Sequence, residues 1–189
     1  MKNTKLITML CLGALIACSP SKKGLEPTSE QVSPRERLIE NLRATPQKGI
    51  MFGHHDDTVY GIGWEFDEGG SDVQKVCGDY PAVISFDLGE IELGGDKSLD
   101  KVPFEKIRKE IINQYNRGGL VSLSWHPRNP KTGGDAWDVS DHAVVKSILP
   151  EGENYEKFQS WLGKVNDFIL SLKTSDGTCL LYTSPSPRD

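Results

Sequence analysis

The hydrophobic pattern of the chain alternates between short apolar runs and longer amphipathic segments. In the longer segments apolar side chains return every three or four positions, which is the spacing of one face of a helix. A first helix is expected over residues 34–42, because Leu38, Ile39 and Leu42 have this spacing and Thr45-Pro46 follows. Three strand-helix units come next, with strands expected at 49–53, 82–87 and 120–125, and with helices expected from Ser71, over 103–117 and over 154–173.

This alternation predicts a parallel β-sheet with helices packed against it. A helical bundle would show the same apolar stripes, but not the strand-length runs between them. Eight units of this size would need roughly 345 residues, within the range of (β/α)₈ barrels, whereas the chain has 189. The expected fold is therefore α/β, a partial (β/α)₈ TIM barrel made of about the first three βα units.

Residues 1–17 have the pattern of a lipoprotein signal peptide. A short basic start precedes an apolar run of about a dozen residues, too short to cross a bilayer as a lasting helix. Leu15-Ile16-Ala17-Cys18 resembles a bacterial lipobox, in which Cys18 is lipidated; a plain cleaved signal is the alternative. Residues 18–33 are polar and expected to be a flexible tether. We therefore expect an exported protein, lipid-anchored to the cell envelope. A periplasm-facing outer-membrane anchor is favoured over the cell surface, because no acidic cluster follows Cys18.

The end of the chain does not continue the pattern. A fourth strand is due near residue 179, but Cys179-Leu180-Leu181-Tyr182 is short, and Pro185 and Pro187 at alternate positions cannot donate to a regular ladder. Residues 179–189 resemble an in-frame translation of a sequencing-library adapter; a genuine disordered C-terminus is the alternative. We therefore expect residues 34–178 to be the N-terminal part of a truncated domain.

Charge and cysteine content exclude several classes of protein. With 22 basic and 27 acidic residues the net charge is −5, which argues against capture of nucleic acid or anionic lipid by electrostatics. Of four cysteines, only Cys77 lies in the expected folded part, so no disulfide framework is expected. Gly61-Ile62-Gly63 lacks the third glycine of a dinucleotide motif, and no cofactor is expected. We expect a monomer.

In a barrel of βα units the residues after each strand form the functional face. His54 and Asp56 follow the first strand and could share a face, but no third ligand stands at a suggestive spacing, so no metal is expected. A structural histidine and an imidazole that donates to a sugar hydroxyl are the remaining interpretations of His54. After the second strand come Asp87, Glu90 and Glu92, whose alternation with apolar residues is typical of a solvated strand edge or loop rather than a catalytic pair.

The third strand ends in Trp125-His126, and an extended loop then carries Trp137. Indole rings and an imidazole at a strand mouth suit a cleft that stacks and hydrogen-bonds a neutral polyhydroxylated ligand. Barrel filling by Trp125 and loop packing by Trp137 are the structural alternatives. Trp64 is a third indole with the same ambiguity.

These residues resemble glycoside hydrolase family 26, chiefly β-mannanases. The resemblance spans about residues 35–178, and its one noted departure is His55, where glutamine is more often expected. The matching runs are Met51-Phe52-Gly53-His54-His55-Asp56-Asp57, Ser71-Asp72-Val73, Gly78-Asp79-Tyr80-Pro81-Ala82-Val83 with Asp87, and Ser124-Trp125-His126-Pro127-Arg128-Asn129-Pro130 with Thr132-Gly133-Gly134.

The resemblance implies a retaining endo-acting hydrolase of β-1,4-mannosidic bonds, whose substrate is mannan or galactomannan. The family's acid/base glutamate lies in an Arg-Pro-x-His-Glu type run after the fourth strand, and its nucleophilic glutamate follows the seventh; this chain has no such run. The resemblance assigns His126, Trp125, His54 and Asp56 to the sugar site, with roles in binding and support; Trp137 joins them as a stacking candidate.

The expected activity therefore belongs to a longer parent protein, and the 189-residue chain itself is expected to be inactive and prone to aggregation. A β-glucanase or β-xylanase of the same family and a non-catalytic glycan-binding lipoprotein remain alternatives.

Overall fold

The computed structural model describes residues 33–175, 177, 179 and 180 of the chain. The expected signal peptide, Cys18 and the tether up to residue 32 lie outside the described residues, as do residues 181–189 of the expected artefact tail. No helix in the described part combines the length and the apolar character that a membrane span requires.

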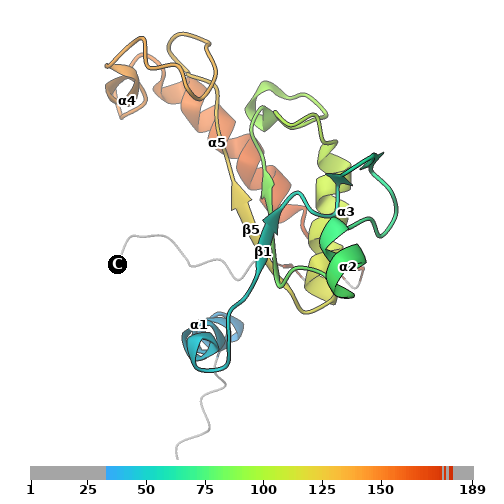
Figure 1. Cartoon of the computed structure of the whole chain (residues 1–189). Helices are drawn as coiled ribbons and strands as arrows, with labels where there is room; N and C mark the ends of the chain where they lie inside the picture. Colours follow the sequence, from blue (N-terminus) through green and yellow to red (C-terminus); the bar gives the residue numbers. More distant parts are fainter. Residues whose placement is uncertain (1–32, 176, 178, 181–189) are drawn as a thin grey trace, which may run out of the picture. The chain divides into compact units, whose positions relative to one another are not determined.

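A parallel three-stranded sheet organises the fold (Figure 1). Its strands are β1 (Gly53–His55), β4 (Val83–Asp87) and β5 (Leu120–Ser124), in the order β1-β4-β5. In the register, His55 lies opposite Ser85, and Asp87 opposite Ser124. The expected parallel βα arrangement is confirmed, and the carboxyl ends of the strands meet at one edge of the sheet.

The first two helices begin at polar N-cap side chains, and the longer helices lie where apolar periodicity predicts them, whereas the short helix α4 (Val144–Ser147) was not predicted. Ser33 and Glu36 form a reciprocal capping box at the first helix, and Ser71 accepts a hydrogen bond from the Gln74 N–H at the next. Gly78 ends that second helix with a φ of 82°, a conformation that glycine adopts without a steric cost. The helices are α1 (Pro34–Ala44), α2 (Asp72–Cys77), α3 (Phe104–Asn116), α4 (Val144–Ser147) and α5 (Tyr155–Leu170), with 3₁₀ turns η1 (Thr45–Gln47) and η2 (Ile91–Leu93).

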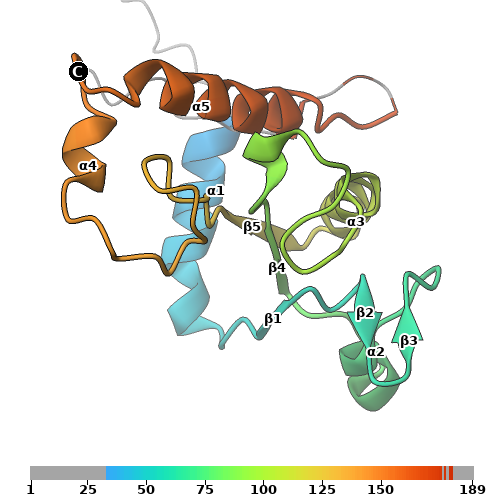
Figure 2. The ribbon, with the colours of Figure 1, turned by 90° about the horizontal axis from the view of Figure 1, so that it is seen from above.

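The apolar core lies where β4 meets α3 and α5 (Figure 2). Ile84 and Phe86 occupy alternate positions of β4, so both side chains point to the same face of the sheet, and both are fully buried. Phe104 of α3 meets Phe168 of α5 edge to face, with ring centroids 6.0 Å apart. The buried apolar cluster contains Val59, Ile84, Phe86, Leu88, Ile91, Val102, Phe104, Ile107, Ile111, Phe168 and Leu172.

The first strand differs from the expectation. The apolar run 49–53 was expected to form it, but β1 begins only at Gly53, and Ile50 is 98% exposed. The register places Gly53 opposite Val83, so an earlier start would bring the run opposite Pro81, which has no N–H to donate. β1 is also an edge strand of the described sheet, and this leaves the apolar run without a partner.

The connections contain elements that periodicity did not predict. An antiparallel hairpin of β2 (Tyr60–Gly61) and β3 (Trp64–Glu65) precedes α2. A Cβ on Gly61 would lie 2.3 Å from Nε1 of Trp64, so only glycine leaves room for that indole. Elements of two to four residues are too short for a repeat to be visible. After α5, Leu180 donates its N–H to the Leu172 carbonyl at 3.0 Å.

Candidate functional site

A cleft of about 650 Å³ opens at the carboxyl ends of the parallel strands. β1 contributes His55, β4 contributes Asp87 and β5 contributes Ser124 to its lining. The loop after β5 adds His126 and Trp137. Residues from all three strand ends therefore meet in one concave site, as expected for a sheet of βα units.

Asp87 and His126 form a hydrogen-bonded pair in the cleft. The buried carboxylate of Asp87 accepts hydrogen bonds from the Gly89 N–H at 2.6 Å, from the Ser124 hydroxyl at 2.5 Å and from Nδ1 of His126. Burial by itself raises the pKa of Asp87, but these three donors outweigh burial and hold the pKa below its ordinary value. Because the carboxylate only accepts, Nδ1 of His126 carries the proton, and Nε2 remains for a ligand.

The two indoles expected in the site have different surroundings. Trp137 lines the cleft with its side chain 84% exposed, so its ring is open to a ligand. Trp125 packs against the apolar core, stacks on Phe158 with ring centroids 5.9 Å apart, and is not part of the cleft lining. The role of Trp125 in sugar binding stays a prediction, while its packing role is visible here.

Glu92 and Glu90 also differ from one another. The expectation of a solvated edge is wrong for Glu92, which is 1% exposed in the turn η2 and accepts hydrogen bonds from Nε1 of Trp125 at 2.9 Å and from the Arg128 N–H at 2.7 Å. Glu90 lines the cleft and forms an ion pair with Arg128 at 2.6 Å. Through Glu92, η2 therefore anchors the segment that carries His126, because Trp125 and Arg128 lie on either side of that histidine in the chain.

Trp64 lies away from the cleft lining. Its Nε1 donates to Oδ1 of Asp72 at 2.7 Å, and Oδ2 of the same carboxylate accepts from the Ile62 N–H at 2.7 Å. Lys75 lies over the indole, 4.9 Å from its centroid. In the described residues Trp64 thus joins the β2–β3 hairpin to α2.

His54 and Asp56 do not line the cleft. His54 is exposed, and its Nδ1 lies 2.7 Å from the His55 carbonyl oxygen. Asp56 is 2% exposed, and its pKa is raised to about 6, chiefly by burial and also by the carboxylates of Asp100 and Asp87, while His55 and Tyr60 lower it. Their assignment to the sugar site stays a prediction.

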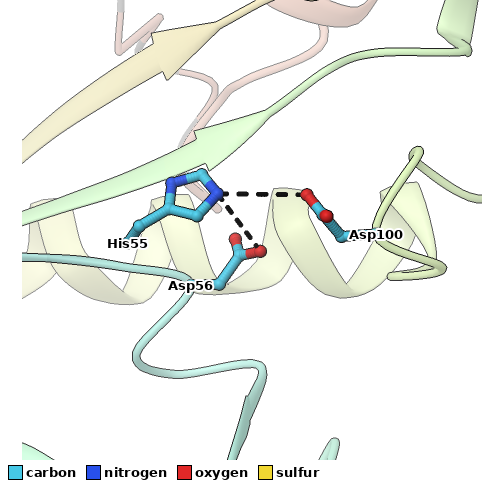
Figure 3. Close-up of side chains that lie close together, drawn as sticks. All are labelled: His55, Asp56 and Asp100. Carbon is cyan, nitrogen blue, oxygen red and sulfur yellow. Dashed lines mark ion pairs between the residues drawn. The ribbon is translucent and has the colours of Figure 1, made fainter.

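The residue between them, His55, does line the cleft, and the sequence singled it out only as a departure from the family. Its imidazole lies beside the carboxylates of Asp56 and Asp100 (Figure 3). The sequence signal that could have found His55 is the period of two along a strand, which places His54 and His55 on opposite faces. In the structure His55 is in register with Ser85 of β4, and Nδ1 of His55 lies 2.8 Å from the Ser85 hydroxyl.

Comparison with known proteins identifies the family. Residues 27–183 match Glycosyl hydrolase family 26. The chain is 31% identical over 147 residues to a mannan endo-1,4-β-mannosidase of Bifidobacterium adolescentis, an alignment that covers 76% of this chain and 14% of that protein.

Similar solved structures belong to the same family. A GH26 β-mannanase from Bacteroides ovatus is 62% identical, with a TM-score of 0.74, over 75% of this chain and 41% of that one. The catalytic domain of a GH26 endo-β-1,4-mannanase from Bacillus sp. JAMB-750 is 27% identical, with a TM-score of 0.63, over 75% and 39%. The chain thus spans less than half the length of these relatives, and its strand-helix units are part of a (β/α)₈ barrel. With most of its length matched, the chain belongs to glycosyl hydrolase family 26.

Proposed function

We propose that this chain is the N-terminal part of an endo-acting β-1,4-mannan hydrolase and that it supplies one wall of the substrate cleft. The observation that carries the proposal is the cleft at the strand ends, in which Asp87 orients His126 and Trp137 presents an open ring. A flat indole beside fixed polar groups is the combination that stacks and hydrogen-bonds a neutral sugar ring.

The carboxylates of this wall suit binding rather than bond cleavage. A retaining hydrolase needs two carboxyl groups about 5 to 5.5 Å apart, one of which keeps a proton at neutral pH. Asp87 accepts hydrogen bonds from three donors, and its pKa is lowered. Glu90 forms an ion pair with Arg128. We therefore propose that the acid/base and the nucleophile come from the part of the barrel beyond this chain, and that the 189-residue chain cleaves nothing.

Mannan is the proposed substrate because both the curated relative and the solved relatives above bear mannan-specific names. The cleft fits this choice in charge, since mannan is neutral and does not depend on a basic surface for capture. A β-glucan or xylan substrate would place a different sugar against the same wall, and the experiment below separates these cases.

The test uses native gels cast with galactomannan, xylan or β-glucan, together with a reducing-end assay. The purified chain is expected to be retarded by galactomannan and to release no reducing ends. Stronger retardation by xylan or β-glucan would contradict mannan as the substrate. Reducing-end release by the chain would contradict the proposal that both catalytic carboxylates lie beyond it. The longer parent protein proposed here, expressed whole, is expected to hydrolyse galactomannan; failure to do so would contradict the proposed activity.

We also propose that Cys18 carries a lipid that anchors the protein to the cell envelope. The support is the run Leu15-Ile16-Ala17-Cys18 after an apolar segment. Acylation places the domain at a membrane surface while it remains in water. Metabolic labelling with a radioactive fatty acid in a bacterial host should mark the wild-type chain and leave Cys18→Ser unlabelled. Equal labelling of both chains would contradict the anchor.

A further inference from the structure

Three potential metal ligands lie close together (Figure 3), and two of them, His55 and Asp100, line the cleft. His55 ends β1, Asp56 follows it directly, and Asp100 comes from the loop between η2 and α3. Nε2 of His55 lies 3.4 Å from Oδ2 of Asp56 and 4.0 Å from Oδ2 of Asp100, and all three ligating atoms lie within 4.8 Å of one another. Ligands bound to one ion at about 2.0–2.2 Å are separated by similar distances.

The carboxylate of Asp56 supplies an independent observation. Asp56 is 2% exposed, and its Oδ1 is buried without a hydrogen-bond partner among the described residues. The backbone of Asp56 has a φ of 55°, which an aspartate rarely adopts, and its carboxyl group faces the imidazole of His55 (Figure 3). A buried carboxylate oxygen is costly unless a proton donor or a cation satisfies it.

The imidazole of His55 is oriented as a ligand would be. Its Nδ1 lies 2.8 Å from the hydroxyl of Ser85 on the neighbouring strand. When Nδ1 donates to that hydroxyl, the lone pair of Nε2 points toward the two carboxylates. Metal-bound histidines characteristically donate their second ring N–H to an acceptor in this way.

Among the described residues, no lysine or arginine balances the charge of the cluster. Within the described part of the chain, the ion pairs of Asp56 and of Asp100 are formed with His55 and with no lysine or arginine. The nearby cations are engaged with another carboxylate, since Lys101 and Arg128 both pair with Glu90. The two carboxylates therefore carry negative charge that a divalent ion would balance.

We infer that His55, Asp56 and Asp100 bind one divalent cation, and the mixed nitrogen and oxygen donors select Zn²⁺ over Ca²⁺ or Mg²⁺. His55 and Asp100 line the cleft, so the remaining coordination position of the ion opens toward it. The ion ties the end of β1 to the loop before α3 and balances the charge of the buried Asp56 carboxylate. This inference does not depend on the chain binding mannan.

Isothermal titration of the 189-residue chain with zinc chloride, in metal-free buffer, tests the inference. One Zn²⁺ per chain is expected to bind, and Ca²⁺ is expected to bind at least about tenfold more weakly. Asp100→Asn and His55→Gln should each weaken Zn²⁺ binding by about tenfold or more, because each removes one of three ligands. His54→Gln, a change at the neighbouring exposed histidine on the same strand, should leave the affinity unchanged.

Two further measurements separate loss of the metal site from loss of folding. Circular dichroism of each variant reports whether it folds; Asp100 lies in an exposed loop, so Asp100→Asn is the variant on which the result depends. Cobalt substitution should produce visible absorption bands in the wild-type chain that Asp100→Asn weakens. The inference is overturned if zinc does not bind, if folded Asp100→Asn and His55→Gln bind as tightly as the wild type, or if only His54→Gln loses binding.

Discussion

Asp87 and His126, which are 39 positions apart in the chain, are joined by a hydrogen bond between the Asp87 carboxylate and Nδ1 of the imidazole. The contact connects the end of β4 to the segment after β5, and the register that sets Asp87 opposite Ser124 makes it possible. Its chemical consequence is a fixed tautomer, because an ionised carboxylate accepts only from a protonated Nδ1.

Replacing Asp87 by asparagine is expected to change that tautomer. The amide can turn its NH₂ group toward Nδ1, so the proton moves to Nε2 and the face of His126 that meets a ligand becomes a donor. Nitrogen-15 spectra of the imidazole should shift from the Nδ1–H to the Nε2–H pattern, and affinity for galactomannan should fall by about tenfold, or about 1.4 kcal/mol. Ser124→Ala removes another donor to Asp87 and should keep the tautomer. An unchanged spectrum in Asp87→Asn would refute the positioning role.

The lowered pKa of Asp87 predicts loss of stability in acid. The folded-state pKa lies below the unfolded value of about 3.9. The ionised form therefore stabilises the fold above about pH 4, and this contribution is lost as the pH falls through the folded pKa. Urea unfolding between pH 3 and 7 should show that the difference in free energy of unfolding between the wild type and Asp87→Asn shrinks below about pH 4. A difference that is constant with pH would contradict the assigned ionisation.

Glu92→Gln is expected to destabilise the fold although it changes no apolar contact. Glu92 accepts from both Trp125 and Arg128, whereas glutamine has one acceptor oxygen and leaves one buried donor facing its NH₂ group. The expected loss is about 1–3 kcal/mol in the free energy of unfolding, measured with urea. Glu105→Gln is the matched control: that side chain is 80% exposed, and the change should stay within about 0.5 kcal/mol. Equal effects of the two substitutions would rule out an anchoring role for Glu92.

Trp137→Ala should separate binding from stability. The indole is exposed in the cleft, so its loss should leave the free energy of unfolding within about 0.5 kcal/mol. Affinity for galactomannan should fall about five- to tenfold, because an aromatic stacking contact contributes about 1 kcal/mol. Trp125→Phe should show the reverse pattern, with reduced stability through the lost hydrogen bond to Glu92 and a smaller loss of affinity. Wild-type affinity in Trp137→Ala would remove this residue from the site.

The helices were predictable because their signals are local. The expected helix at 103–117 is α3 (Phe104–Asn116), and the expected start at Ser71 is the N-cap of α2. An apolar stripe and a capping side chain act within one or two turns, so neighbouring residues contain the whole signal. The strand expected at 49–53 was misplaced because strand limits depend on a partner, here a segment that contains Pro81.

By itself, the sequence determined the class of fold, the limits of the longer helices and the family, all of which rest on periodicity and on contiguous motifs. Only the tertiary structure decided which side chains meet. It turned Trp125 toward Phe158 and Glu92, left Trp137 open in the cleft, and brought His55 beside Asp100. The physical reason is that burial and hydrogen bonding are set by partners more than thirty positions away, and no local pattern encodes the strand register that brings those partners together.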